Sequence, residues 1–583
     1  MPCTFIPVIV SGSIVRQAYE VDDLAADPRP GADRAGDNEL AVPSAVPSSK
    51  LRRGWLFALP CVAVLMVWMY ALAVHANSLL VNSDGATVIL QGQTVASGNV
   101  LLHGWTLSLD SWWTLDVAFY SVATAVAGVR PVLLIAGPAL IASLVVVVGM
   151  VIARRGRRGP AAFIGMLTVV AVLALPTHLL ATNLMCGPIH VSTALYALVA
   201  FLGLRRNRVG WGWIMTVVML AAGILGDLQM VSYGVIPVLA AGLVAMARRR
   251  SIRAGTPAVS AAVCSVAIAL VVRQLVVALG GFSLGATNRA ASAGQVLQNV
   301  THLLPVLAQL VGLGDSIDGT GGVPVALQAV HVVVAALLIA TLAAGIVRLL
   351  RGVRYGTAPG DPPGPISGLE PEPWRMDDLL VVATVGPVLN FIFLAASTSG
   401  YQRYLTATVI FGSVLAGRIV TLWWASDHGR VLRRWAVGIG VLSIGCFVAV
   451  CGVQLSQPAP STPAARLPSF LESAHLTSGV GDFWAASITT VESGGTVAVR
   501  PVVPDSDGKL EAYNKGDVPG WFAGQSFRFV VYPRSNSPTS PTQVSLRTAV
   551  NTWGRPSKVT DVAGYVVLVW PHPISVTNYD PRL

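Results

Sequence analysis

Long stretches of apolar residues alternate with short polar segments along most of the chain. A helix that crosses the hydrocarbon core of a bilayer needs roughly 17–25 mainly apolar residues. One apolar stretch, at 114–130, is ambiguous by this measure, and we do not count it as a span. The remaining stretches predict an all-α, multi-pass membrane bundle of eleven spans, at residues 55–77, 131–153, 161–182, 187–204, 210–226, 231–247, 257–280, 323–350, 377–397, 404–424 and 434–455.

Basic residues gather in short clusters between these spans. Cytoplasmic loops of membrane proteins are enriched in Lys and Arg. If Lys50 is cytoplasmic and the chain crosses the membrane at each predicted span, every cluster lies on the cytoplasmic side. Counting 114–130 as a span would move all later clusters outside, so we interpret it as an amphipathic or re-entrant segment on the outer face. The clusters lie at 50–53, 154–158, 205–208, 248–253, 348–354 and 430–434.

The two ends of the chain differ in composition from the predicted bundle. Residues 1–50 mix several acidic residues with Ala, Gly and Pro, which is typical of a disordered tail, here on the cytoplasmic side. A Pro-rich linker at 457–463 comes after the last span, and the odd number of spans places the C-terminal segment outside the cytoplasm. There, β-branched and aromatic runs predict the strands of a small extracytoplasmic α/β domain, at 496–503, 527–532 and 565–570.

These patterns divide the chain into three parts. They are a tail (1–50), a membrane domain (51–455) with outer loops at 78–130 and 281–322, and an extracytoplasmic domain (456–583).

The composition agrees with a membrane protein. Only 11% of the residues are charged and 54% are hydrophobic, whereas soluble domains carry roughly 25% charged residues. The net charge of +11 would suggest a nucleic-acid partner in a soluble protein. Here the basic clusters explain it by orientation, so no nucleic-acid partner is expected. The bias toward Ala, Val, Gly and Arg is typical of a high-GC bacterium, which predicts a location in the plasma (inner) membrane.

The first outer loop is the densest candidate for chemistry. Asp84 lies a few residues after the first span, at the boundary between membrane and water, where a carboxylate can act as a general base toward a hydroxyl. The alternative is a solvated turn residue beside Gly85. Ionisable residues are scarce in the middle of the spans, and Arg273 is the main exception. This scarcity argues against an ion-coupled transporter.

Several short stretches resemble the GT-C superfamily of membrane glycosyltransferases. The first is the combination of Asp84, the GNVLLHGW stretch at 98–105, and a segment rich in Ser, Trp and Asp at 108–116. The others are Gly226-Asp227-Leu228, similar to a short outer-loop Asp motif, the stretch 397–405, similar to an RYL motif, and 479–495, similar to the start of an outer soluble domain in related bacterial proteins.

The resemblance implies a GT-C-like fold and an inverting sugar transfer from a polyprenyl-phosphate donor in the outer leaflet. Asp84 would take the proton of the acceptor hydroxyl, and Arg403, with its neighbour Tyr404, would bind the donor phosphate. Arg289 is a second candidate for the phosphate from its position alone. The alternative for Arg403 is snorkelling toward lipid headgroups.

Five further residues are candidates for substrate binding: His103, Trp105, Asp110, Asp116 and Asp227. Trp105 could stack on a sugar or belong to an interfacial aromatic belt. Asp110 and Asp116 could assist the base or hold a divalent cation, and helix capping or solvation is the alternative. The first loop has no adjacent Asp-x-Asp or Asp-Glu pair, which argues against a metal-dependent variant, and the phosphate-loop and H-E-x-x-H motifs are absent.

The resemblance therefore implies a polyprenyl-phosphate-sugar-dependent glycosyltransferase that acts at the outer face of the membrane. Its partners would be the lipid-linked donor and a glycan or glycolipid acceptor of the cell envelope. The alternative is a non-catalytic membrane protein, either a carrier or a lipid- or glycan-binding scaffold. A carrier should contain inverted repeats and broken mid-membrane helices, which the sequence does not display clearly, and a scaffold would tolerate Asp84→Asn.

Overall fold

A computed structural model of the chain supplies the fold. The predicted tail at 1–50 and the candidate Arg289 lie outside the residues that it describes. The described residues are 62–74, 83–154, 157–187, 190–204, 209–285, 290–313, 325–355, 376–393, 402–425, 429–456, 463–513, 515–534 and 543–576.

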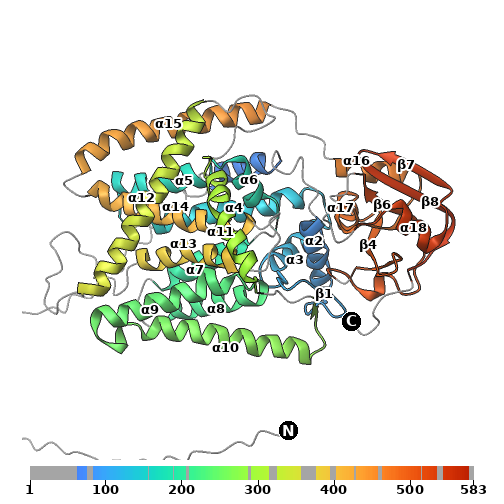
Figure 1. Ribbon diagram of the computed structural model, residues 1–583, viewed down its shortest axis with the longest axis horizontal. Helices are drawn as coiled ribbons and strands as arrows, with labels where there is room; N and C mark the ends of the chain where they lie inside the picture. The colour runs from blue at the N-terminus through green and yellow to red at the C-terminus, as the bar shows by residue number, and fades with distance from the viewer. Residues whose placement is uncertain are drawn as a thin grey trace, which may run out of the picture. The chain divides into compact units, whose positions relative to one another are not determined.

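The larger part of the described chain is helical (Figure 1). A first helix, Val62–Val74, precedes α2. The helices up to the linker are α2 (Ser83–Ala96), α3 (Asp116–Ala127), α4 (Leu133–Ala153), α5 (Pro160–Leu173), α6 (His178–Met185), α7 (Val191–Gly203), α8 (Trp211–Gly226), η1 (Val231–Val235, a π-helix), α9 (Ile236–Arg249), η2 (Ile252–Ala254), α10 (Thr256–Ala278), α11 (Ala293–Leu310), α12 (Val325–Tyr355), α13 (Met376–Phe393), α14 (Gln402–Ala425) and α15 (Gly429–Ser456).

Six of the described helices are long and apolar enough to cross a membrane, or seven if the bent pair α5 and α6 is one span. The predicted count of eleven is therefore not confirmed. The stretches predicted at 187–204 and 210–226 form the shorter apolar helices α7 and α8. The stretch at 161–182 breaks with a 92° bend, because Pro176 cannot continue a helix and the side chain of Thr177 caps the next one by accepting from the amide of Leu180.

Helix α3 covers the ambiguous stretch in the first loop. Its 12 residues measure about 18 Å at 1.5 Å per residue, too short to cross the hydrocarbon core. It packs along α2, where a Cβ added at Gly92 would lie 2.7 Å from the backbone carbon of Tyr120. The structure thus agrees with excluding 114–130 from the spans.

The helices of the bundle approach each other closely where glycines face one another. Helix α14 lies at the centre, in contact with α4, α5, α12 and α13. A Cβ on Gly165 of α5 would lie 2.7 Å from the carbonyl oxygen of Gly417 of α14, and one on Gly417 would lie 2.5 Å from the oxygen of Gly165. Small residues at such crossings let the backbones touch, which is how helices gain packing energy in a lipid environment.

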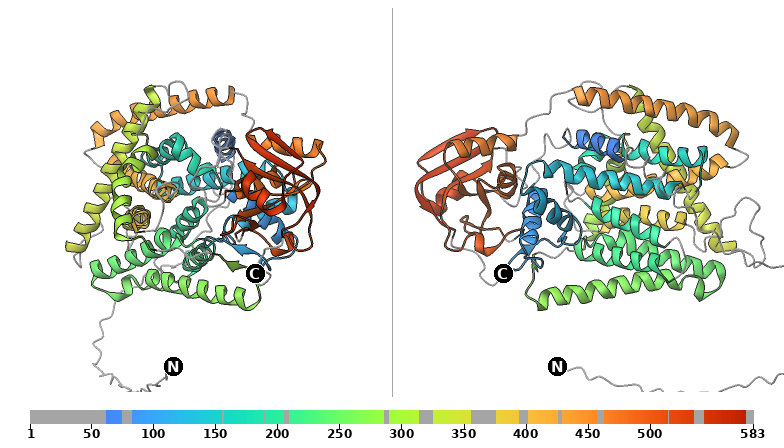
Figure 2. Two further views of the ribbon diagram at one scale, coloured as in Figure 1. Left: turned by 45° about the vertical axis from the view of Figure 1, so that its right-hand side comes forward. Right: turned by 180° about the vertical axis from the view of Figure 1, so that it is seen from behind.

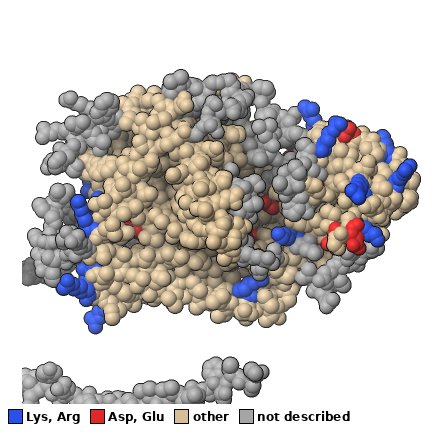
Figure 3. Space-filling model, viewed as in Figure 1, with Lys and Arg blue, Asp and Glu red and all other residues tan. Residues whose placement is uncertain are grey.

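Two buried ion pairs join α13 to its neighbours. Asp378 accepts hydrogen bonds from the guanidinium of Arg248 on α9, and Asp377 accepts one of 2.6 Å from Nε of Arg418 on α14. Both aspartates lie in the first turn of α13, where the exposed backbone amides favour a carboxylate. Lys and Arg side chains also gather at this end of the bundle, near the α9–α10 turn, while the visible flank is almost free of charge (Figure 3).

The segment after the linker folds around a six-stranded mixed sheet in the order β5-β4-β3-β6-β8-β7. Strand β3 runs parallel to β4 and β6, and the other pairs are antiparallel. The predicted strands at 496–503, 527–532 and 565–570 are confirmed as β4, β6 and β8. The elements are α16 (Pro463–Ser473), β3 (Ser478–Gly481), α17 (Phe483–Glu492), β4 (Ala498–Pro504), β5 (Leu510–Ala512), η3 (Pro519–Trp521), β6 (Phe527–Pro533), α18 (Leu546–Trp553), β7 (Lys558–Val562) and β8 (Tyr565–Ile574).

This C-terminal domain contacts the first loop (Figure 2). Helix α17 packs on α2, and the hydroxyl of Thr87 donates a 2.9 Å hydrogen bond to that of Ser487. Strand β1 (Thr106–Leu107) pairs in parallel with β2 (Ser283–Leu284), and Thr106 also bridges to Asp517. Three segments that are distant in the sequence therefore meet next to α2.

Candidate functional site

The first acidic residue of the site is Asp84, near the start of α2. Asp84 lies in the first turn of this helix, where the exposed backbone amides favour a carboxylate. Its side chain is partly buried. Burial raises the pKa of Asp84, and the positive charges of Arg403 and Lys515 offset part of that rise. Both cations therefore lie near this carboxylate, although they come from distant parts of the chain.

A buried pair of His190 and Asp227 forms the second part of the site. Nδ1 of His190 lies 2.7 Å from Oδ2 of Asp227, which also accepts from the hydroxyl of Thr193. The other carboxylate oxygen accepts a 2.8 Å hydrogen bond from the amide of Gln229. Burial acts to raise the pKa of Asp227, but the charge and hydrogen bond of His190, together with the hydrogen bonds from Thr193 and Gln229, outweigh it and hold the pKa below its ordinary value. Asp227 therefore stays ionised.

The local backbone explains how these two residues meet. Asp227 comes directly after the last residue of α8 and is extended, at φ −157° and ψ 120°. The π-helix η1 begins four residues later, and such π-turns are frequent at functional sites. His190 precedes α7 with a left-handed φ of 61°, a conformation that costs a non-glycine residue energy and persists where surrounding contacts enforce it.

Asp110 completes a group of three potential metal ligands. One ligand atom each from Asp110, His190 and Asp227 lies within 4.8 Å of the other two. Burial and the neighbouring Asp227 carboxylate raise the pKa of Asp110 to about 7. Two carboxylates and an imidazole are a donor set that suits zinc or another transition-metal ion. The residues present therefore fit a divalent cation, which would relieve the repulsion between the two carboxylates.

Asp116 lies beside this group but has its own partner. The hydroxyl of Ser192 donates a 2.5 Å hydrogen bond to Oδ2 of Asp116, which is buried at the start of α3. Burial raises the pKa of Asp116 to about 6. Because Ser192 and Thr193 are consecutive, α7 holds Asp116 and Asp227 with adjacent residues.

Arg403 and Tyr404 bring the start of α14 into the same cluster. The ring of Tyr404 stacks on His190 with 4.8 Å between centroids and 29° between planes. The guanidinium carbon of Arg403 lies 5.7 Å from the centre of the Tyr404 ring. Arg403 interacts electrostatically with Asp84 and Asp110, and its Nε is buried without a hydrogen-bond partner. A buried donor with no protein partner is costly, and it suits a ligand that accepts a hydrogen bond.

The remaining candidates occupy other places. His103 is exposed, and its Nδ1 lies 2.8 Å from the carbonyl oxygen of Gly280, so it ties the first loop to the end of α10. Trp105 is buried and packs edge-on against Trp521 of the C-terminal domain, 5.1 Å between ring centroids. That packing favours a structural role for Trp105 over contact with a sugar.

Sequence reasoning missed two contributions to the site. His190 lies inside the predicted span at 187–204 and was therefore not considered as a site residue. The polar residues Ser192 and Thr193, which follow it closely, could have indicated a polar site at this end of the span. Lys515 belongs to a loop of the C-terminal domain, and no motif marks it. Tyr513 belongs to the same loop, and burial, with a contribution from the charge of Asp84, raises the pKa of Tyr513 to about 12.

Comparisons with known proteins add little to this geometry. No family model and no curated protein matches the chain. One solved structure with a similar course of the chain is the Archaeoglobus fulgidus oligosaccharyltransferase, crystallised as a complex with Zn and sulfate. It is 12% identical, with a TM-score of 0.43 over 80% of this chain and 68% of the other. That score is too low to support an inference, so the interpretation of the site rests on its own residues.

Proposed function

We propose that the protein is an inverting glycosyltransferase of the GT-C type, which moves a sugar from a polyprenyl-phosphate donor to a hydroxyl acceptor. The observation that carries this proposal is the proximity of Asp84 and Arg403 in one polar site. A carboxylate and an arginine are the two groups that such a transfer needs: a base for the acceptor and a cation for the leaving phosphate.

The chemistry depends on these two side chains. Asp84 removes the proton of the acceptor hydroxyl while that oxygen attacks the anomeric carbon of the sugar from the face opposite the phosphate. The bond between the anomeric carbon and the phosphate oxygen breaks, and its electron pair stays on the phosphate. Arg403, whose buried Nε has no protein partner, donates hydrogen bonds to that phosphate. Because burial raises the pKa of Asp84, the carboxylate is a stronger base than an ordinary aspartate.

Three other side chains support the arrangement. His190 fixes Asp227 by a hydrogen bond and Tyr404 by stacking, and it thereby sets the start of α14 on which Arg403 lies. Asp110, His190 and Asp227 would hold a divalent cation. Such a cation would supply positive charge to the phosphate region when bound.

The position of the site along the bundle supports an outer-face location. Asp227 precedes a continuous helical stretch, Val231–Arg249, of 19 residues. That stretch measures about 28 Å at 1.5 Å per residue, close to the thickness of a hydrocarbon core. Its far end carries the basic cluster, and Lys and Arg favour the cytoplasmic side. The site, at the other end, would then face the extracytoplasmic leaflet.

Release of lipid phosphate from a panel of polyprenyl-phosphate sugars tests the proposal with the purified full-length chain. Asp84→Asn should lower the rate at least about 100-fold, because the base is lost, while its thermal stability stays that of the wild type. Asp507→Asn, at an exposed position of the C-terminal domain, is the matched control and should not change the rate. An active Asp84→Asn variant would overturn the proposal, and no release from any donor would favour the non-catalytic alternative.

A further inference from the structure

A loop of the C-terminal domain is attached by its backbone to the first loop. The amide of Gly516 donates a 2.6 Å hydrogen bond to the carbonyl oxygen of Thr106, whose own amide donates one of 3.1 Å to the oxygen of Asp517. The same β1 strand pairs on its other side with β2. The loop that contains Lys515 is therefore an added edge of a small sheet.

The same loop lies against α2, one turn after Asp84. Gly516 has a φ of +68°, and a Cβ placed on it would come within 2.6 Å of Cγ2 of Thr87. Residues three apart on a helix lie on the same side, so Thr87 and Asp84 share a face of α2. Because Thr87 also hydrogen-bonds to Ser487, the C-terminal domain holds this face from two directions.

Lys515 is thereby placed beside the carboxylate of Asp84. Its charge, like that of Arg403, acts on Asp84. Among the described residues, neither Lys515 nor Arg403 forms an ion pair with a carboxylate. Two cations from distant parts of the chain thus flank one site, with their charges available to an anion.

We propose that Lys515 and Arg403 bind the same phosphate group of the lipid-linked donor, so that the C-terminal domain supplies a donor-binding residue. This inference rests on the proposed glycosyl transfer. The donor phosphate is a diester with one negative charge. When the bond to the sugar breaks, it becomes a monoester with a charge of about −1.5 to −2 at neutral pH. A second cation therefore stabilises the transition state and the leaving lipid phosphate more than it stabilises the bound donor.

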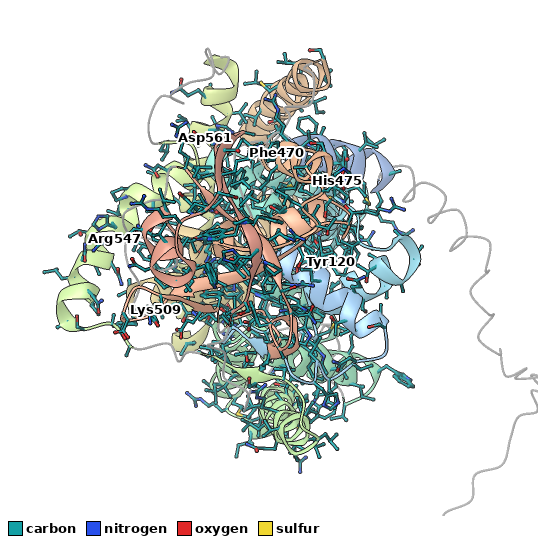
Figure 4. All side chains as sticks on the ribbon, turned by 90° about the vertical axis from the view of Figure 1, so that its right-hand side faces the viewer. Tyr120, Phe470, His475, Lys509, Arg547 and Asp561 are labelled. Carbon is teal, nitrogen blue, oxygen red and sulfur yellow. The ribbon has the colours of Figure 1, made fainter. Side chains whose placement is uncertain are left out.

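Binding of polyprenyl monophosphate, the proposed leaving group, tests this role in the full-length chain in detergent. Lys515→Gln should weaken binding about tenfold, the typical effect of a hydrogen bond to a charged group, and Lys515→Arg should restore it. Uncharged polyprenol of the same length should bind all variants equally. Lys509→Gln is the matched control, because Lys509 lies on the outer side of the C-terminal domain (Figure 4).

A pair of glycine variants tests the placement of the loop. Gly516→Ala would strain a left-handed residue and push against Thr87, whereas Gly508→Ala would strain φ +73° with no atom nearer than 3.8 Å. Only Gly516→Ala should reproduce the loss of phosphate binding seen with Lys515→Gln. Full phosphate affinity in Gly516→Ala would contradict the proposed placement.

The outcomes separate this inference from the function on which it rests. If Arg403→Ala weakens binding of polyprenyl monophosphate and Lys515→Gln does not, Lys515 has no part in donor binding and the proposed function stands. A Lys515→Gln variant that raises KM for the acceptor alone would likewise overturn the inference. If the wild-type chain binds the phosphate no better than polyprenol, the proposed function fails as well.

Discussion

The imidazole of His190 hydrogen-bonds to Asp227 over 2.7 Å and stacks on Tyr404. This contact connects the turn after α8 to the start of α14, where Arg403 lies. The histidine is 2% exposed and holds a left-handed backbone conformation, so its position is set by its neighbours. The acidic and basic halves of the site are consequently aligned by one side chain.

Removal of His190 should abolish metal binding at the site. The group of Asp110, His190 and Asp227 has the spacing for one divalent cation, and each ligand lost from such a set lowers affinity strongly. We expect one zinc ion per wild-type chain, measured by elemental analysis after dialysis, and none in His190→Gln. Exposed His475→Gln is the control. Equal zinc content in the His190 and His475 variants would contradict the site.

Arg403→Ala should affect the donor more than the acceptor. Because the proposal places the guanidinium at the leaving phosphate, its loss should lower kcat/KM for the donor about 10- to 160-fold, which corresponds to the roughly 1.5–3 kcal/mol of a hydrogen bond to a charged group. KM for the acceptor should change little. Arg403→Lys should recover only part of the loss, because an ammonium lacks the planar fork of donors. Unchanged donor kinetics in Arg403→Ala would refute this role.

The pH dependence of transfer should report the environment of Asp84. A general base works when ionised, so kcat/KM falls as the pH drops below its pKa. Burial raises that pKa, and the acid limb should therefore lie above the ordinary aspartate value of about 3.9. Arg403 and Lys515 both lower it, so Lys515→Gln should move the limb to still higher pH. A limb that stays in place in this variant would show that the Lys515 charge does not reach Asp84.

The buried ion pair of Arg248 and Asp378 should matter greatly for stability. Asp378→Asn leaves a buried guanidinium without its counter-charge, which typically costs about 3–5 kcal/mol. Thermal unfolding in detergent should show a markedly lower Tm. The double variant Arg248→Met with Asp378→Leu should lose much less, because no charge is left unpaired.

An exposed ion pair in the same chain provides the control for that comparison. Nη1 of Arg534 lies 3.6 Å from Oδ2 of Asp561, and these side chains are 69% and 54% exposed. Surface pairs contribute about 0–1 kcal/mol, so Asp561→Asn should leave Tm almost unchanged. Equal effects of Asp378→Asn and Asp561→Asn would mean that burial does not govern the ion pairs of this protein.

Much of the site could be predicted from the sequence because charged residues are rare in it. In a chain with 11% charged residues, Asp84, Asp110, Asp227 and Arg403 stand out between apolar stretches, and all four lie in one cluster. The resemblance implied that Asp84 and Arg403 share one site, whereas the contact of Asp110 and Asp227 with His190 depends on the tertiary fold and was not visible. Arg289 lies outside the described residues, and its predicted role in binding the donor phosphate stays a prediction.

The differences from the prediction have physical causes in the same pattern. Hydropathy alone does not fix where a helix begins and ends, so the stretches at 187–204 and 210–226 were counted as full spans, whereas α7 and α8 are shorter apolar helices. The same averaging hid His190 within an apolar stretch. Lys515 could not be found at all, because its position depends on the backbone hydrogen bonds of Gly516 and Asp517 to Thr106. Such contacts between distant segments leave no local signal.

The small sheet that joins β1, β2 and Asp517 has a consequence for how the protein matures. Thr106 and Ser283 can pair early in synthesis, but the bridge to Asp517 must wait until that segment has been synthesised. An unfinished chain in the membrane therefore lacks Lys515 beside Asp84. Under the proposed function, full affinity for the lipid-linked donor would come only with the folding of the last domain, so an incomplete chain would use that donor poorly.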